Sequence, residues 1–237
     1  MNAPTIARRI SELGPWFHDL EVRGVRTAPD HPLGDFLRDL WRQVATAFPA
    51  DMTGLTALDI GCNAGFYSQQ LSRRGATVTA IDHDPHYLAQ ARFAASAAGA
   101  EIEFLELDVY DVGSLGRRFD YVIFMGVFYH LRHPLLALDR VAALPRRRLV
   151  FQSMLRGCGG TLPLESDYPF EERAIFEHPR FPAMYFVEGE YANDPTNWWI
   201  PNQAGMEAML RSAGLRIDER IGGEVYICSP ADMEVAA

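Results

Sequence analysis

The chain has 237 residues and a formal net charge of −9, and 48% of its residues are hydrophobic. This length suits one α/β domain with additional segments, and such a chain buries roughly 70–75% of its unfolded surface, so it needs no disulfide or metal for stability. Its three cysteines are scattered without a C-x-x-C pair, which predicts neither a disulfide framework nor a zinc site. No apolar run could span a membrane, and residues 1–10 contain no apolar signal core, so we expect a cytoplasmic protein without a membrane partner.

The basic residues limit both the chemistry and the partners of the chain. All 22 are arginine, which excludes a lysine Schiff base, a lysine general base and a phosphate-binding lysine. Residues 151–237 contain 14 acidic residues and six arginines, and the first 150 residues are close to neutral. Because a large polyanion such as tRNA binds a basic face, this distribution disfavours a nucleic-acid partner.

The beginning of the chain predicts a helical cap. Apolar residues at helical spacing over 6–13 end at Gly14–Pro15, which predicts a short amphipathic helix. Residues 24–34 contain two prolines and predict a loop, and a second helix follows up to Pro49. We therefore expect two parts, an N-terminal helical cap over 1–50 and a main domain over 51–237.

From residue 55 onward, strand and helix patterns alternate, which predicts a Rossmann-like, doubly wound α/β sheet. Gly222–Gly223 predicts a hairpin between the last two strands, so that the last of seven strands runs antiparallel. The predicted strands are 55–60, 77–81, 101–107, 119–125, 148–154, 215–220 and 225–228. The predicted helices of this part are 64–74, 85–98, 134–143 and 202–213, with a short helix or turn over 111–116.

Residues 155–200 interrupt this alternation. They contain nine aromatic residues and five prolines, and the prolines argue against one long helix. The segment follows the fifth strand, at the carboxyl edge where such sheets bind ligands. We predict a substrate lid. A structural flap or a dimer contact is the alternative, because exposed aromatic patches also mark protein interfaces, and we expect a monomer or a homodimer.

The turn after the first strand has the spacing D-x-G-x-x-x-G, with Asp59, Gly61 and Gly65. Glycine permits a sharp turn and a close approach to a ligand, and the helix that follows offers free N–H groups. Asp82 ends the second strand about 20 residues later, where such folds place a carboxylate on ribose hydroxyls. A tight turn and a helix cap before Pro85 are the simpler interpretations. The spacing differs from the G-x-G-x-x-G of dinucleotide sites, which argues against NAD.

This loop resembles motif I of the class I S-adenosylmethionine (SAM) methyltransferases, in which it lies against the methionine end of the cofactor. The resemblance implies that 51–237 is a SAM-binding methyltransferase domain, that its cofactor is SAM, and that a substrate nucleophile attacks the sulfonium methyl in line. Asp59 would orient the loop or meet the methionine amine, and Asp108 and Val109 would meet adenine.

A second block is more specific. Residues 126–135, Gly-Val-Phe-Tyr-His-Leu-Arg-His-Pro-Leu, resemble the tRNA wobble-uridine carboxymethyltransferase group, although Phe128 replaces an aliphatic residue. Gly14–Pro15 and residues 197–201 resemble other blocks of that group, and the resemblance covers about residues 13–215. It implies that Met125 and Tyr129 contact the cofactor.

Two departures from that group point to ordinary SAM and methyl transfer. The group uses carboxy-SAM and holds its extra carboxylate with a lysine before the Gly-Pro and an arginine near the C-terminus. This chain has Leu13 at the first position and no basic residue after Arg220. A buried carboxylate without these partners would cost roughly several kcal/mol.

These features predict a methyltransferase that acts on an O, N or C nucleophile of a small-molecule acceptor. A tRNA-modifying carboxymethyltransferase and a non-enzymatic SAM-binding or NAD-binding module are the alternatives. His130 is the first candidate for a general base, followed by Tyr129 and His133, and a purely structural hydrogen bond is the alternative role of His130. No carboxylate-rich motif joins the histidine pairs, so we expect no metal. The predicted cofactor contacts are Asp59, Gly61, Cys62, Asn63, Gly65, Asp82, His83, Asp108, Val109, Met125 and Tyr129.

Overall fold

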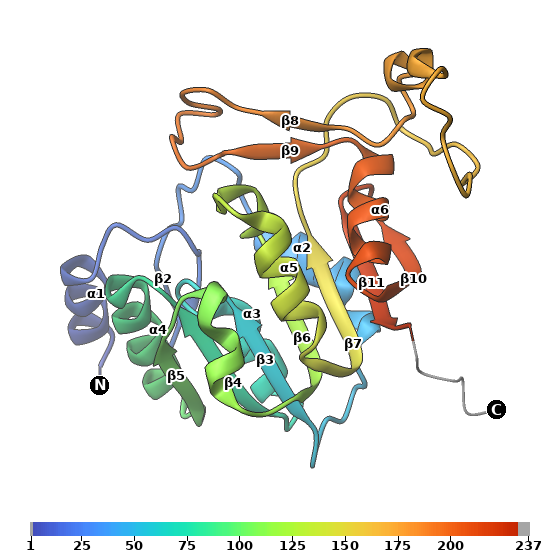
Figure 1. Ribbon diagram of the computed structural model, residues 1–237. Helices are drawn as coiled ribbons and strands as arrows, with labels where there is room; N and C mark the ends of the chain where they lie inside the picture. The colour runs from blue at the N-terminus through green and yellow to red at the C-terminus, as the bar shows by residue number, and fades with distance from the viewer. Residues whose placement is uncertain (1, 232–237) are drawn as a thin grey trace.

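The computed structural model describes residues 2–231 and contains a central sheet with helices on both faces (Figure 1). Its strand order is β10-β11-β7-β6-β3-β4-β5. The strands β3 to β7 are parallel, and β11 runs antiparallel to both β7 and β10. This confirms the predicted doubly wound, seven-stranded sheet with an antiparallel last strand. The strands are β3 (Thr56–Ile60), β4 (Thr77–Asp82), β5 (Ile102–Glu106), β6 (Phe119–Met125), β7 (Pro145–Gln152), β10 (Leu215–Ile221) and β11 (Val225–Pro230).

The helices start and stop where the local chemistry requires it. Asp84 caps α4 by accepting the backbone N–H of His86 at 2.8 Å, and Gly99 ends that helix in the left-handed region. Gly65 is left-handed too, so α3 begins after it and not at the predicted residue 64. The helices around the sheet are α3 (Phe66–Ser72), α4 (Pro85–Ala98), α5 (Pro134–Ala142) and α6 (Gln203–Ser212), with 3-10 helices η2 (Val109–Leu115) and η3 (Phe128–His130).

The N-terminal segment packs into the same core as the sheet. It comprises α1 (Ala3–Glu12), a hairpin of β1 (Glu21–Val22) and β2 (Val25–Arg26), α2 (Phe36–Val44) and the 3-10 helix η1 (Ala45–Ala47). The hairpin corrects the prediction of a loop from residue 24, since the turn at Arg23–Gly24 has positive φ and reverses the chain. Ile6, Ile10 and Leu13 are buried with side chains of α3 and α4. The boundary at residue 50 remains a prediction, and residues 232–237 of the predicted main domain lie outside the described residues.

Alternate side chains of each central strand enter two different cores. On β6, Tyr121 and Ile123 pack on the side of α1 to α4, whereas Val122 and Phe124 pack on the side of α5, α6 and η2. Period-two alternation is what a sheet covered on both faces requires. The carboxyl ends of the parallel strands therefore remain as the place for a ligand.

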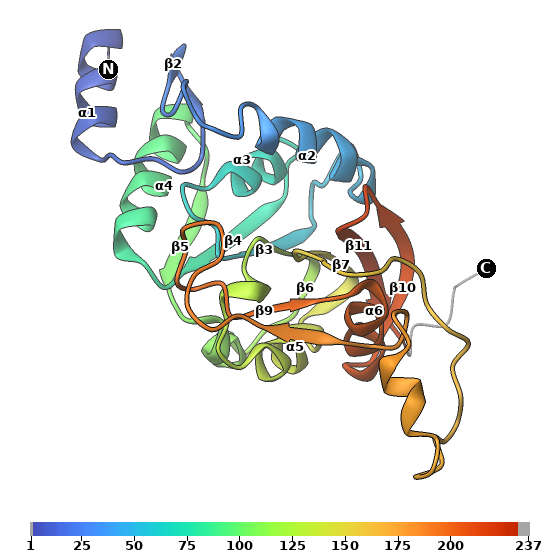
Figure 2. The same cartoon turned by 90° about the horizontal axis from the view of Figure 1, so that it is seen from above.

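The insertion after β7 forms a second small hairpin. Its strands β8 (Met184–Phe186) and β9 (Trp199–Pro201) pair antiparallel, and a 3-10 helix, η4 (Arg173–Glu177), precedes them. The hairpin runs across the carboxyl end of the sheet, above α5 (Figures 1 and 2). The part around η4 extends away from the sheet, and Leu164, Phe170 and Phe176 are exposed there. Within residues 2–231, no helix is long and apolar enough to cross a membrane.

Candidate active site

A cavity of about 1150 Å³ lies at the carboxyl ends of β3, β4, β6 and β7. Its remaining walls come from the N-terminal segment, from the turn between β10 and β11, and from the insertion. The described residues of the insertion that line it are Asp194, Thr196 and Trp198. The contribution of the insertion to the wall therefore comes from the loop between β8 and β9.

The glycine loop forms one wall almost entirely with backbone. The N–H groups of Gly61 and Cys62 both donate to the carbonyl of Ile81, at 2.9 and 3.0 Å, which ties the loop to β4. Gly61 has a φ of +68°, and a Cβ added there would lie 2.4 Å from Cγ2 of Val127. The turn therefore requires glycine both for its backbone conformation and for the space beside Val127.

Asp82 joins this loop to the end of β4. Its carboxylate accepts the backbone N–H of Asn63 at 2.8 Å and that of Asp84 at 3.0 Å. The residue is 5% exposed and lines the cavity, and burial raises its pKa above the ordinary value. A carboxylate accepts more hydrogen bonds than these two, so Asp82 has capacity left for ligand hydroxyls.

Three predicted cofactor residues belong to β3 or to the loop and do not line the described cavity. Asp59 is 1% exposed and accepts the hydroxyl of Ser68 at 2.5 Å, so it joins β3 to α3. Burial raises its pKa to about 6. Cys62 is buried as well, and Gly65 forms the start of α3, where an added Cβ would lie 3.3 Å from Ala91. Their side chains or backbone support the loop from this position, and direct contacts of Asp59, Cys62 and Gly65 with the cofactor stay a prediction.

The other predicted cofactor residues line the cavity. Asp108 caps η2 by accepting the N–H of Tyr110 at 2.9 Å. His83 is largely exposed, and its Nδ1 lies 3.6 Å from the carboxylate of Asp82. The full set of predicted cofactor residues in the wall is Gly61, Asn63, Asp82, His83, Asp108, Val109, Met125 and Tyr129.

The two histidines after β6 have different positions. His130 lines the cavity, and its Nδ1 lies 2.8 Å from Oγ1 of Thr196 and 3.7 Å from a carboxylate oxygen of Asp194. Burial lowers the pKa of His130, and the nearby carboxylate of Asp194 opposes part of this decrease. His133 precedes α5, donates its backbone N–H to the hydroxyl of Tyr110 at 2.9 Å, and is exposed. Its imidazole lies outside the described wall, so the structure does not support His133 as a base.

Tyr129 and the end of β7 form the wall next to His130. Burial, with the nearby carboxylates Glu224 and Asp194, raises the pKa of Tyr129 to about 12. The side-chain oxygen of Gln152 accepts the N–H of Gly126 at 2.9 Å, and its amide group donates to Glu224 at 3.3 Å. Glu224 and Gln152 were missed in the sequence, because neither belongs to a motif.

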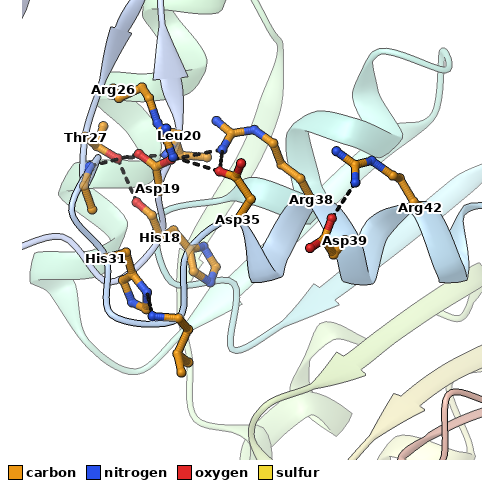
Figure 3. A network of polar contacts seen from close by, with 12 residues as sticks. His18, Asp19, Leu20, Arg26, Thr27, His31, Asp35, Arg38, Asp39 and Arg42 are labelled. Carbon is orange, nitrogen blue, oxygen red and sulfur yellow. Dashed lines mark hydrogen bonds and ion pairs between the residues drawn. The ribbon is translucent and has the colours of Figure 1, made fainter.

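The N-terminal wall is held by a network around Asp19 (Figure 3). The buried carboxylate of Asp19 accepts hydrogen bonds from Arg26 and Arg38, and Asp35 pairs with the same two arginines. Thr27 donates its hydroxyl to the carbonyl of His18 at 2.7 Å, which fixes the backbone beside the cavity. These contacts join the β1–β2 hairpin to α2 and hold the residues that line this wall, including Phe17, His18, Phe36 and Leu40.

His18 is a buried polar residue in that wall. Burial, with a smaller contribution from His31, lowers its pKa to about 3, so the imidazole is neutral. Its Nδ1 has no hydrogen-bond partner within the described part of the chain. Sequence reasoning missed it, although it follows Gly14–Pro15, one of the blocks that carried the resemblance, by three residues.

The charge of the cavity is strongly negative. Of the described residues that line it, one is an arginine, Arg132, whose guanidinium carbon lies 4.6 Å from the ring centre of Trp198. No group of three or more His, Cys, Asp or Glu side chains in residues 2–231 could hold a metal ion. The six lining carboxylates are Asp39, Asp82, Asp84, Asp108, Asp194 and Glu224.

A glycine loop and a strand-end carboxylate at the carboxyl edge of this sheet define a nucleotide-binding α/β protein whose last strand is antiparallel. Comparison with known proteins narrows the class. Residues 57–146 match the family model of a methyltransferase domain. The crystal structure of the N-terminal domain of EvdMO1 in the presence of SAH and D-fucose has the same fold, with a TM-score of 0.67 and 23% identity over 98% of this chain and 97% of that one.

Two curated relatives have similar sequences. The ubiquinone biosynthesis O-methyltransferase of Cereibacter sphaeroides is 35% identical over 99 residues, 39% of this chain and 40% of that protein. The tRNA U34 carboxymethyltransferase of Methylococcus capsulatus is 30% identical over 182 residues, 74% of this chain and 49% of that protein. The chain thus spans less than half the length of the curated relatives it matches. Residues 57–146 are thus a methyltransferase domain, and the chain has the fold of the class I SAM-dependent methyltransferases, whose cofactor is SAM.

Proposed function

We propose that the cavity binds SAM and that the protein transfers the methyl group to an O, N or C nucleophile of a small-molecule acceptor. The observation that carries this proposal is the junction between Asp82 and the glycine loop. One buried carboxylate lines the cavity while it accepts backbone N–H groups from the loop and from the start of α4. This junction suits a ribose, and the glycine backbone at Gly61 permits a close approach of the methionine part of the cofactor.

Cavity residues that follow one another along the chain suit successive parts of SAM. Gly61 and Asn63 suit the methionine end, Asp82 and His83 the ribose, and Asp108 and Val109 the adenine. When bound, SAM supplies a methyl group that its positive sulfur has already activated, so the protein mainly aligns the reactants and excludes water. Met125 and Tyr129, at the end of β6, would form the wall near that methyl group, and the hairpin β8–β9 would shield it.

The charge of the wall favours SAM over carboxy-SAM. SAM carries a positive sulfur, which six lining carboxylates attract, and an additional carboxylate would be repelled by them. Leu13, which stands at the lysine position of the carboxymethyltransferase group, is 8% exposed and offers no cation. Arg132, the one arginine among the described lining residues, packs on the ring of Trp198.

Calorimetric titration with SAM, carboxy-SAM and NAD⁺ tests the choice of cofactor. We expect SAM to bind at least tenfold more tightly than carboxy-SAM, a difference of about 1.4 kcal/mol, and NAD⁺ not to bind. A panel of alcohols, phenols, sugars such as D-fucose, amines and carboxylic acids, assayed by release of SAH, then tests the acceptor. Failure of SAM to bind would reject the proposal.

A tRNA-modifying activity is the second candidate, because a tRNA U34 carboxymethyltransferase is 30% identical over 74% of this chain. It requires carboxy-SAM and a surface that attracts a polyanion. The same titration separates the candidates, since a preference for carboxy-SAM would favour tRNA. The acidic cavity and the net charge of −9 support the small-molecule acceptor.

A further inference from the structure

Thr196, in the loop between β8 and β9, connects the imidazole of His130 to the carboxylate of Asp194. Nδ1 of His130 lies 2.8 Å from Oγ1 of Thr196. That hydroxyl donates to Oδ1 of Asp194 at 2.6 Å, and the backbone N–H of Thr196 donates to the same oxygen at 2.7 Å. The three side chains therefore form one hydrogen-bonded chain that ends at the cavity wall.

The number of hydrogens in this chain determines the form of the imidazole. A threonine hydroxyl has one hydrogen, and Thr196 uses it on Asp194. Burial alone would raise the pKa of Asp194, but the hydrogen bonds from Thr196 and the nearby His130 lower it overall, so this carboxylate has no hydrogen to give. Oγ1 can then only accept from Nδ1. The neutral ring of His130 carries its hydrogen on Nδ1, and Nε2 keeps its lone pair.

We propose that Thr196 and Asp194 are positioning residues that hold His130 as the Nδ1–H form, so that Nε2 takes the proton of a neutral hydroxyl acceptor, an alcohol or a phenol. This inference rests on the proposed methyl transfer and names its acceptor class. A hydroxyl gains most from a base, because its oxygen becomes a good nucleophile only as the proton leaves. A carboxylic acid would arrive as an anion and meet the carboxylates of Asp194 and Glu224.

The reaction balances with these groups. The O–H bond of the acceptor breaks, and its proton moves to Nε2 of His130. An electron pair of the acceptor oxygen forms the new O–C bond, and the pair of the broken S–C bond stays on sulfur, which leaves as the neutral thioether of SAH. The positive charge of the sulfonium thus ends on the imidazolium, 3.7 Å from a carboxylate oxygen of Asp194, and is then lost to solvent as a proton.

The loop between β8 and β9 is held against the segment that carries His130. The backbone N–H of Trp198 donates to the carbonyl of Tyr129 at 2.8 Å. The indole N–H of Trp199 donates to the carbonyl of Arg132 at 3.4 Å, and Arg132 packs on the ring of Trp198. The insertion thereby supplies Thr196 and Asp194, the two residues proposed to position His130, and the contacts that keep them in place.

The tautomer of His130 tests this inference without cofactor or acceptor. We would record long-range ¹H–¹⁵N spectra of the full chain labelled with ¹⁵N-histidine, above the ordinary histidine pKa of about 6.5, and assign His130 with His130→Gln. We expect Nδ1–H in the wild type and in Thr196→Ser, and a shift toward Nε2–H in Thr196→Val, which lacks the acceptor for Nδ1–H. An Nε2–H ring in the wild type, or no shift in Thr196→Val, would overturn the proposal.

Two further measurements separate this inference from the proposed function. SAM titration of the same variants should give affinities within about twofold of the wild type, because Thr196 is placed on the acceptor side. If SAM did not bind to the wild type, the proposed function would be rejected, and the tautomer result would still stand.

With an acceptor from the panel, Thr196→Val should lower kcat about tenfold or more with little change in KM, and Thr196→Ser should restore most of it. An equal rate for both variants would refute the positioning role.

Discussion

The cavity has two walls that are built by different means. The strand-end wall contains Gly61, Asn63, Asp82 and Asp108, which directly follow or end β3, β4 and β5. Hydrogen bonds donated by backbone N–H groups hold it. The second wall contains His18, Thr196 and Glu224, which come from three segments that are far apart in the chain. Contacts made by side chains hold this wall. The comparison indicates that the strand ends provide the place proposed for the cofactor, whereas the acceptor site that we propose depends on additions to the fold.

The largest expected effect separates the two histidines that follow β6. His130→Gln should lower kcat by about 10²–10⁴-fold, the usual contribution of a general base, and should leave SAM affinity nearly unchanged. His133→Gln should have little effect, since its imidazole lies outside the described wall. Steady-state kinetics with an acceptor from the panel makes the measurement. If His133→Gln were the more damaging change, the assignment of the base would be wrong.

The pH dependence of the rate sharpens the same assignment. Burial lowers the pKa of His130, with a further contribution from His83, while Asp194 and Thr196 oppose the shift. A base must be unprotonated, so the acid limb of kcat should fall at a pH below the ordinary histidine value of about 6.5. An acid limb well above that value would contradict a buried His130 as the base.

The next largest effect concerns the glycine loop. Gly61→Ala should destabilise the protein by about 1–2 kcal/mol from its left-handed backbone and by about 1–3 kcal/mol from the contact with Val127, and it should weaken SAM binding. Gly99→Ala is the matched control, since its φ of +70° is similar and nothing lies within 4 Å of an added Cβ. Urea unfolding measures both. Equal losses at the two positions would show that the contact with Val127 has no cost.

Asp82→Asn tests the strand-end wall without changing its shape. Hydrogen bonds to a charged group contribute about 1.5–3 kcal/mol, so SAM affinity should fall by roughly 10–150-fold. Asp84→Asn removes a neighbouring charge while asparagine still caps α4, and its effect should be clearly smaller. Calorimetry compares the two variants. Equal effects would mean that Asp82 acts only through overall charge.

The smallest expected effect concerns stability at the N-terminal wall. Asp19→Asn should cost about 1–2 kcal/mol at neutral pH, because its partners Arg26 and Arg38 are partly exposed. Burial alone would raise the pKa of Asp19, but Arg26, Ala28 and Arg38 lower it overall. The advantage of the wild type should therefore be complete above the ordinary Asp pKa of about 3.9 and decline as pH falls through the lower folded-state value.

Urea unfolding across this pH range measures the effect at Asp19. Asp39→Asn is the control, since Asp39 and Arg42 form an exposed pair and should contribute little. A difference between wild type and Asp19→Asn that grew toward acid pH would contradict the network.

Much of the fold was predictable because its signals are local. The strand over 119–125 and the helix over 85–98 were predicted with the bounds that the structure has, since apolar runs and Pro and Gly signals mark them. The β1–β2 hairpin and the pairing of β8 with β9 were not predicted. Their strands have two or three residues, which is too short for a periodic pattern.

The sequence by itself determined the doubly wound sheet, the glycine loop and the carboxylate of Asp82, because each follows from residues near one another in the chain. Only the tertiary structure decided that Asp59 turns inward to Ser68 and that His130, not His133, lines the cavity. It also decided that the hydroxyl of Thr196, 66 residues further along the chain, lies 2.8 Å from Nδ1 of that imidazole. Such choices depend on how distant segments pack, and neither motif spacing nor periodicity records that packing.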